Sequence, residues 1–274
     1  MIDFETLDGL GVLITGGASG IGLALAQTFH AQGARVFLVD RDAERLSESA
    51  RSLGVGGAVC DVTDRESVEA ALEEAWQTCG PIDVLCANAG VVRSAPLIEV
   101  GREEAEWQFA VNVWGVLDCC QAFVRRLRRE GRSGHLLLTG SEASLSNPDF
   151  VRPMQVGIYH MTKHAVLSMG DALRGELAPD GIGVSVLCPG PTPTDLAVSS
   201  EAARVAHLGG EADLRGPQAG DEEAADARSR APREVAEAAL AGLRRGLFVI
   251  PTHPHIRDDV RARYQEIERG FEGL

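Results

Sequence analysis

A short apolar run leads directly into a glycine-rich turn in Val12-Leu13-Ile14-Thr15-Gly16-Gly17-Ala18-Ser19-Gly20-Ile21-Gly22. Gly16 permits a tight turn, while Gly20 and Gly22 let the backbone approach a pyrophosphate and let the following helix pack on a sheet. The first turn of that helix offers unpaired N–H groups and a partial positive charge to an anion. The pattern predicts a strand, a phosphate-binding turn and a helix over residues 21–30.

An acidic residue, Asp40, ends the next apolar run at residues 36–39. A carboxylate at that position can accept hydrogen bonds from both hydroxyls of an adenosine ribose, and it would repel a 2′-phosphate. Ser19 supplies no compensating cation within the turn. Arg41 is a complication, because a guanidinium beside the ribose could stack on adenine or pair with a phosphate. The arrangement favours NAD over NADP as the bound dinucleotide.

Strand-like runs alternate with helical patterns along most of the chain. Further strands are expected at 58–60, 82–86, 135–139, 184–188 and 247–250, and the clearest helices at 104–129 and 159–177. Several strands are continuously apolar, as in a parallel sheet that is buried on both faces. The sequence therefore predicts one α/β domain over residues 1–274, with a doubly wound, Rossmann-like sheet of seven mostly parallel strands and helices on both faces.

Two segments depart from this alternation. Residues 195–230 are rich in Ala, Gly, Glu and Asp, which is typical of a mobile surface insertion or of a lid that orders over a substrate. These two interpretations are compatible. Residues 255–274 are expected to form a short charged helix.

Composition narrows the class of partner and the compartment. The net charge of −14 argues against a nucleic-acid partner and gives no attraction to anionic membranes. The six cysteines form no CxxC pair or zinc pattern, so we expect buried free thiols and no metal site. The N-terminus does not read as a signal peptide, and no apolar run reaches the ~18 residues of a membrane span. A cytoplasmic protein is expected.

Tyr159 and Lys163 form the pair that points to a reaction. They are four residues apart in a predicted helix, so their side chains share one face. Hydride transfer to or from a carbonyl carbon requires a proton donor or acceptor at the oxygen. A phenol has an unperturbed pKa of ~10, and a nearby ammonium lowers it. We therefore expect Tyr159 to shuttle the proton, with Lys163 depressing its pKa.

Taken together, these motifs resemble those of the classical short-chain dehydrogenase/reductase family along nearly the whole chain. The glycine turn matches the family's TGxxxGxG pattern, and Asn88-Ala89-Gly90 its NNAG motif, with Ala87 in place of the first Asn. Asp61-Val62 resembles its adenine-contacting pair. The segment from Pro189-Gly190 to Thr194 resembles its PGxxxT element beside the nicotinamide, with Thr192 in place of a commoner aliphatic residue.

The resemblance implies a catalytic tetrad of Asn112, Ser141, Tyr159 and Lys163. Ser141 would polarise the substrate oxygen, Lys163 would also bind the nicotinamide ribose, and Asn112 would hold a water that links Lys163 to solvent. Ser141 lies farther from Tyr159 than is usual, and Ser144 and Ser146 are nearer, but Ser141 directly follows a predicted strand. The implied cofactor contacts are Gly16, Ser19, Gly20, Ile21, Gly22, Asp40, Arg41, Asp61, Val62, Asn88, Ala89, Gly90, Tyr159, Lys163, Pro189, Gly190, Thr192 and Thr194.

The expected function is an NAD-dependent oxidoreductase for a small-molecule secondary alcohol or ketone. Apolar residues in 91–97, in the loop after Ser141 and in 195–230 suggest a steroid-like, terpenoid or aromatic substrate. The alternatives are an NADP-dependent carbonyl reductase on the same fold and a non-catalytic dinucleotide-binding scaffold. The resemblance also implies a homo-oligomer, either a dimer or a tetramer.

Overall fold

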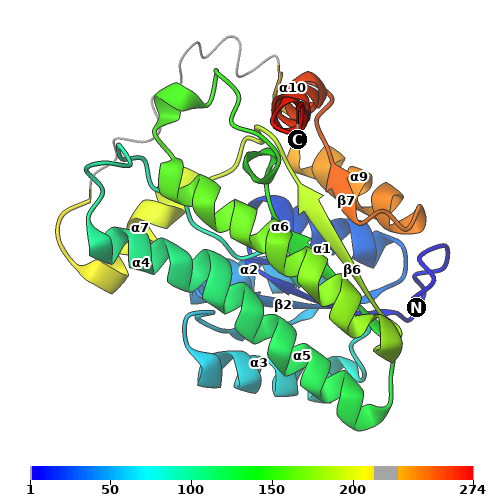
Figure 1. Cartoon of the computed structure of the whole chain (residues 1–274). Coiled ribbons are helices and arrows are strands. Elements are labelled where there is room, and N and C mark those ends of the chain that lie inside the picture. The colour runs from blue at the N-terminus through cyan, green and yellow to red at the C-terminus, as the bar shows by residue number, and fades with distance from the viewer. Residues whose placement is uncertain (1, 213–227, 274) are drawn as a thin grey trace.

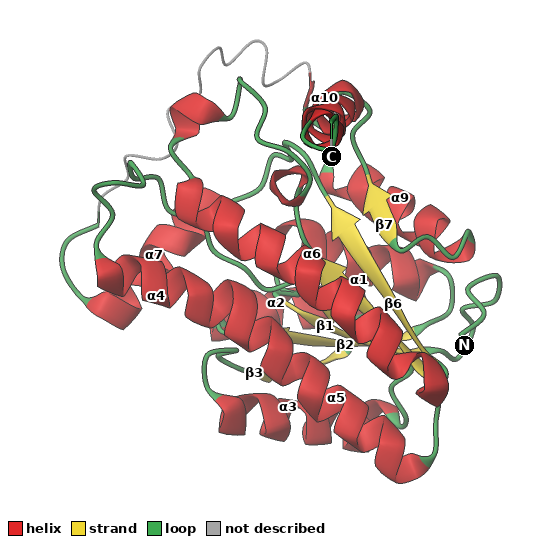
Figure 2. Cartoon of the chain, viewed as in Figure 1, coloured by secondary structure: helices red, strands yellow, loops and turns green. Residues whose placement is uncertain are grey.

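In the computed structural model, the seven strands found among the described residues lie in one parallel sheet (Figures 1 and 2). The structure describes residues 2–212 and 228–273. The strand order is β3-β2-β1-β4-β5-β6-β7. The strands are β1 (Gly11–Thr15), β2 (Arg35–Asp40), β3 (Gly56–Val59), β4 (Val84–Ala87), β5 (Gly134–Thr139), β6 (Ile182–Cys188) and β7 (Val249–Pro251).

Helices cover both faces of the sheet and enclose two hydrophobic cores (Figure 2). One core lies under α3 (Arg65–Cys79), α5 (Val116–Glu130) and α6 (Gly157–Leu177). The other lies under α1 (Gly20–Ala31), α2 (Ala43–Leu53) and α9 (Pro232–Arg244). In Figure 1, α4 (Arg102–Phe109), α5 and α6 lie in front of the sheet and α1 lies behind it. Burial on both faces explains why the strands are continuously apolar.

Local capping residues fix where the helices begin and end. The side chain of Asp42 accepts a hydrogen bond from the backbone N–H of Arg45 at the start of α2, and Asp64 accepts one from Glu66 at the start of α3. Each bond satisfies an N–H that has no partner within its helix. Gly54 ends α2 in the left-handed region, with φ of 68°, where a side chain would be strained.

The order of the strands creates the place for a ligand. Connections leave β1 toward β2 on one side, while β4 pairs with β1 on the other, so the winding reverses between β1 and β4. Ligands of doubly wound sheets bind at the carboxyl ends of the strands beside such a reversal. The glycine turn follows β1, residues 88–90 follow β4, Ser141 follows β5 and Pro189 follows β6.

The predicted fold is confirmed, with differences at particular elements. The six pairings between neighbouring strands of the sheet are all parallel, where the sequence predicted a mostly parallel sheet. The helix predicted over 104–129 is present as α4, a π-helical segment, Ala110–Gly115, and α5, which follow one another without a break. Residues 195–230 contain a regular helix, α7 (Leu196–Leu208), while residues 213–227 of this predicted insertion lie outside the described residues.

The charged tail forms α10 (Ile256–Arg269), as the sequence predicts. In Figure 1, α10 lies close to α9 and β7, near the labelled C-terminal end. Within residues 2–212 and 228–273, no helix combines the length and the hydropathy that crossing a bilayer requires.

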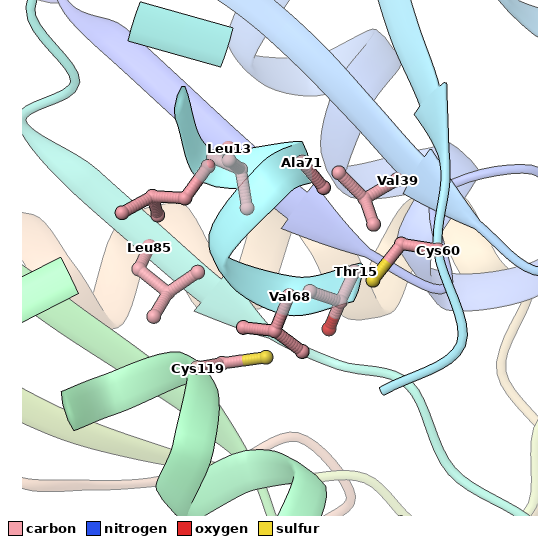
Figure 3. Close-up of a pocket in the computed structure, with 9 residues that line it drawn as sticks. Leu13, Thr15, Val39, Cys60, Val68, Ala71, Leu85 and Cys119 are labelled. Carbon is pink, nitrogen blue, oxygen red and sulfur yellow. The ribbon is translucent and has the colours of Figure 1, made fainter. Parts of the chain in front are cut away.

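A small apolar cavity lies inside the core, between the sheet and helices α3 and α5 (Figure 3). It has about 10 Å³ of free volume, which is at the limit for a single water molecule. Its walls come from β1, β2, β4, α3 and α5, together with Cys60. The cavity is therefore a packing defect of the core, too small for a substrate.

Candidate active site

The glycine turn has the conformation that its sequence predicts. Gly16 and Gly20 have φ of 63° and 52°, in the left-handed region that favours glycine. A Cβ added to Gly22 would lie 2.0 Å from the carbonyl oxygen of Gly16, so only glycine fits there. Ser19 occupies the N-cap of α1 without capping it through its side chain, and Ile21 lies in the first turn of that helix. The N–H groups at the start of α1 can therefore face an anion.

Side chains from neighbouring strands hold this turn. The carboxylate of Asp40 accepts a hydrogen bond from the N–H of Ala18 at 3.1 Å. The amide of Asn88 donates to the carbonyl oxygens of Thr15 and Gly16 at 3.1 and 3.3 Å. The hydroxyl of Thr15 accepts from the N–H groups of Asn88 and Ala89 at 3.0 and 3.1 Å. Asp40 and Asn88 thus join the ends of β2 and β4 to the predicted phosphate site.

The other predicted dinucleotide contacts lie around the same edge of the sheet. Asp61 accepts hydrogen bonds from the backbone N–H and the hydroxyl of Thr63, and buried Val62 packs against Gly115. Thr194 lies against Gly20, where an added Cβ would be 3.2 Å from its methyl group. Residues 189–194 therefore reach from β6 across to the glycine turn. Arg41 is exposed at the end of β2.

Ser141 caps a short 3₁₀ turn, Glu142–Ser144, directly after β5. Its hydroxyl accepts a hydrogen bond from the N–H of Ala143 at 3.1 Å and lies 3.5 Å from the carbonyl oxygen of Pro189. Ser144 instead donates to the carbonyl oxygen of Lys163 at 2.7 Å, which ties the turn to α6. Ser144 therefore has a structural contact on α6, while the side chain of Ser141 interacts with the phenol of Tyr159 and lowers its pKa.

Tyr159 and Lys163 share one face of α6, as their spacing predicts. The Lys163 ammonium lies 5.5 Å from the centre of the Tyr159 ring and donates to the carbonyl oxygen of Thr139 at 2.8 Å. Lys163 is buried, with 3% of its surface exposed. The structure thus brings Ser141, Tyr159 and Lys163 together at the end of β5.

The direction of the Tyr159 pKa differs from the expectation. Burial raises the pKa of Tyr159 to about 12, although the hydrogen bond with Ser141 lowers it and the charge of Glu142 raises it further. Burial also lowers the pKa of Lys163 to about 8. The spacing of four residues indicates the attraction between phenolate and ammonium but not the burial of either group. Burial removes the charged forms of both side chains from water, and this is the largest influence on each pKa.

Asn112 lies within the π-helical segment and bridges two elements. Its carboxamide accepts from the N–H of Val91 and donates to the carbonyl oxygen of Val91, each at 2.8 Å, and it donates to the hydroxyl of Thr162 at 3.0 Å. Gly90 lies between Asn112 and Lys163, since an added Cβ would be 3.3 Å from the Asn112 oxygen and 3.5 Å from the Lys163 nitrogen. π-helical segments are frequent at functional sites.

Three segments that the sequence assigns to the substrate mouth contact one another. The hydroxyl of Ser94 donates to the carbonyl oxygen of Met154 at 2.6 Å, and Ala95 pairs with Val156 in an isolated parallel bridge. Helix α7 joins them, because the N–H of Val92 donates to the hydroxyl of Ser200 at 2.9 Å. An ion pair between Arg93 and the buried Glu201 of α7 adds to this contact.

A polar cluster beside the site was missed by the sequence reasoning. Glu142 is buried, and its carboxylate lies 3.0 Å from the imidazole of His255. Burial raises the pKa of Glu142 to about 8. His253, also buried, accepts a hydrogen bond from the backbone N–H of Gly190. The one available signal was the pair of histidines in Thr252-His253-Pro254-His255, immediately after the last strand.

Comparison with known proteins agrees with this geometry. The family described as short chain dehydrogenase matches residues 11–204. A 1-deoxy-11-beta-hydroxypentalenate dehydrogenase of Streptomyces exfoliatus is 40% identical over 191 residues, covering 67% of this chain and 68% of that protein. A sorbitol dehydrogenase of Cereibacter sphaeroides is 36% identical over 186 residues, covering 67% of this chain and 71% of that protein.

A solved structure extends the similarity to the whole chain. A short chain dehydrogenase/reductase from Burkholderia phymatum, in complex with NAD, superposes with a TM-score of 0.87 at 31% identity, covering 100% of this chain and 98% of that one. The order of the strands, the glycine turn and the Ser141, Tyr159 and Lys163 group thus occur in a chain whose relatives are dehydrogenases. The chain belongs to the short chain dehydrogenase family.

Proposed function

We propose that this protein is an NAD-dependent oxidoreductase that interconverts a secondary alcohol and a ketone. The observation that supports this most strongly is the meeting of Ser141, Tyr159 and Lys163 at the carboxyl end of β5. The glycine turn and residues 189–194 flank this group. A bound nicotinamide would accept or give the hydride, and the side chains would handle the proton.

Each side chain has a role that follows from its contacts. Ser141 would hydrogen-bond the substrate oxygen, and Tyr159 would exchange a proton with it. With a pKa raised to about 12, Tyr159 is protonated near neutral pH and suited to donate to a ketone. Alcohol oxidation requires Tyr159 to ionise, which the positive charge of Lys163 and of an oxidised nicotinamide would favour.

Two further side chains, those of Lys163 and Asn112, would support this proton transfer. Lys163, with a pKa near 8, keeps most of its positive charge at neutral pH. Both residues approach Gly90 from α6 and the π-helical segment, so a water between them would connect Lys163 to solvent. Asn112 is therefore proposed as a positioning residue and Lys163 as a catalytic one.

The residues of the glycine turn fit a dinucleotide. The turn leaves the start of α1 open to a pyrophosphate, and Asp40 stands at the end of β2 where an adenosine ribose would lie. A carboxylate there disfavours a 2′-phosphate, and this supports NAD over NADP. Asp61, Val62, Asn88, Ala89 and Gly90 would complete the adenosine side, and Pro189, Gly190, Thr192 and Thr194 the nicotinamide side.

The substrate is proposed to be apolar, of the steroid-like, terpenoid or aromatic kind. The segments at the mouth carry Val91, Val151 and Val156, which are buried, and Leu97, which is 56% exposed. The similarity to a hydroxypentalenate dehydrogenase supports this class, whereas the similarity to a sorbitol dehydrogenase favours a polyol. Helix α7 would close over the substrate through Ser200 and Glu201.

The assembly and the compartment are also proposals. Trp114 and Met161 are 57% and 48% exposed beside α5 and on α6, which supports a subunit contact in a dimer or tetramer. All six cysteines are free thiols, as is usual in a reducing cytoplasm.

A substrate panel tests this function. Purified protein is mixed with NAD or NADP and with cyclic apolar alcohols, aromatic alcohols or polyols, and the reduced dinucleotide is followed by its fluorescence. We expect turnover with NAD and apolar secondary alcohols, and Asp40→Ala is expected to gain activity with NADP. Preference for polyols would contradict the substrate class. Absence of dinucleotide binding would contradict the function itself.

A further inference from the structure

The turn Pro189-Gly190-Pro191 is held through every backbone polar group that it has. Its two prolines carry no N–H, so these groups are the N–H of Gly190 and three carbonyl oxygens. The N–H of Glu142 donates to Pro189 at 2.7 Å, and the hydroxyl of Thr192 donates to Gly190 at 3.0 Å. The remaining two groups, the N–H of Gly190 and the carbonyl oxygen of Pro191, both meet the imidazole of His253.

The hydrogen bonds of His253 determine its tautomer. The N–H of Gly190 donates to Nδ1 at 2.9 Å, so Nδ1 carries no proton. The proton is then on Nε2, which donates to the carbonyl oxygen of Pro191 at 2.9 Å. The hydroxyl of Thr252 lies 2.7 Å from Nδ1 as a second donor. His253 is thus a neutral imidazole that joins both sides of one turn, with 3% of its surface exposed.

Gly190 is required for this contact. A Cβ at position 190 would lie 2.7 Å from Cγ of the His253 ring and 2.4 Å from a carboxylate oxygen of Glu142. The absence of a side chain therefore lets His253 and Glu142 approach the backbone from the C-terminal segment and from the Ser141 turn. The same turn contacts the candidate site directly, because the Ser141 hydroxyl lies 3.5 Å from the carbonyl oxygen of Pro189.

We propose that His253 is a positioning residue for the reaction, acting as a neutral clamp that fixes the Pro189-Gly190-Pro191 turn against Ser141. This inference rests on the proposed function, which assigns that turn to the nicotinamide. It adds that the C-terminal segment after β7 determines how well the dinucleotide is seated. It also makes the seating depend on one imidazole remaining uncharged.

The surroundings of His253 favour its neutral form. Burial lowers the pKa of His253, and the charges of His255 and Arg230 lower it further, while the hydrogen bond to Pro191 and the charge of Glu234 raise it. Glu142 faces it across Gly190. Because the pKa is lowered on folding, this clamp contributes its full stability when the pH is above the ordinary pKa of histidine. The contribution is lost as the pH falls through the pKa of His253 in the folded protein. Protonation would place two donors, Nδ1–H and the Gly190 N–H, against each other.

Two substitutions at this position separate the hydrogen bonds from the charge. His253→Phe keeps a ring and removes both hydrogen bonds. His253→Asn can still accept from the Gly190 N–H through its side-chain oxygen and cannot gain a proton. His30→Phe and His30→Asn are the matched controls, because His30 is exposed at the far end of α1.

The first measurement needs no dinucleotide and no turnover. The amide resonance of Gly190 is followed by NMR in the free protein from about pH 5 to 8, the range in which histidines titrate. We expect an acid-side movement that follows the His253 ring in the native protein and is absent from His253→Asn, which keeps only the movement caused by Glu142 near pH 8. A Gly190 amide that does not respond to His253 titration, or that is unchanged in His253→Phe, overturns the clamp.

The second measurement is the steady-state kinetics of the same variants. We expect His253→Phe to raise KM for NAD by about tenfold, the effect of one or two lost neutral hydrogen bonds, while KM for the alcohol changes little. His253→Asn is expected to restore most of the NAD affinity and to lose the acid decline of kcat/KM. Kinetics of His253→Phe equal to those of His30→Phe would refute the proposal. A native protein that never turns over would refute the proposed function and leave the amide measurement decisive for the clamp.

Discussion

Replacing Glu142 by Gln is expected to stabilise the protein increasingly as the pH rises. Glu142 is 5% exposed, and burial, reinforced by the charge of Asp259 and opposed by that of Arg228, raises its pKa from 4.5 to about 8. An acid whose pKa is raised on folding stabilises the protein fully when the pH is below its pKa in the unfolded chain. This stability is lost as the pH rises through its pKa in the folded protein. Gln keeps the size and hydrogen-bonding groups of the protonated form at every pH.

The magnitude follows from the displacement of the pKa. The pKa of Glu142 rises from 4.5 to about 8, which is about 3.5 pH units. At about 1.36 kcal/mol per unit, ionisation of Glu142 costs the folded protein at most about 5 kcal/mol. Relaxation and entry of water around ionised Glu142 reduce this figure, as does the His255 imidazole at 3.0 Å. We expect the free energy of unfolding of Glu142→Gln, relative to the native protein, to gain about 2–5 kcal/mol between about pH 5 and pH 9.

Urea unfolding at a series of pH values measures this difference. Glu130→Gln is the control of opposite sign: although burial raises the pKa of Glu130, hydrogen bonds from Arg126 and Trp76 lower it overall. Glu130→Gln should therefore lose stability, relative to the native protein, as the pH rises through the ordinary glutamate range. If the free energies of unfolding of Glu142→Gln and of the native protein differed by the same amount at every pH, burial would not raise the pKa of Glu142, and the prediction would be refuted.

Two further outcomes follow from packing and from charge. Gly22→Ala should abolish dinucleotide binding, measured by NADH fluorescence, because its Cβ would lie 2.0 Å from the Gly16 carbonyl oxygen; binding at native affinity would mean that the turn is not held as described. Cys86, Cys120 and Cys188 should react slowly with a thiol reagent until the chain unfolds, since burial raises the pKa of each thiol; rapid reaction in the native state would contradict their burial.

Much of the fold follows from local patterns. Continuous apolar runs predicted strands buried on both faces, and the glycine turn after the first of them located the reversal of the sheet. The face shared by Tyr159 and Lys163 followed from a spacing of four on a helix. Each of these features is decided within a few residues, so one sequence is enough to infer them.

The features that were missed depend on contacts between distant segments. The π-helical segment around Asn112 is accompanied by hydrogen bonds to Val91, twenty-one positions away in the sequence, which no helical pattern reveals. The contacts of Glu142 with His255 and of Gly190 with His253 join segments whose separation in sequence hides their proximity. The raised pKa of Tyr159 likewise reflects burial, which spacing does not measure.

The central claim is that Tyr159 exchanges the proton during hydride transfer. Its most direct test is single-turnover reduction of NAD by an alcohol that the native protein oxidises, comparing the native protein with Tyr159→Phe after NADH fluorescence shows equal dinucleotide binding. The loss of a general acid–base group should slow the chemical step by about 10²–10⁴-fold while dinucleotide affinity is unchanged. A Tyr159→Phe protein that transfers hydride at the native rate would contradict the account.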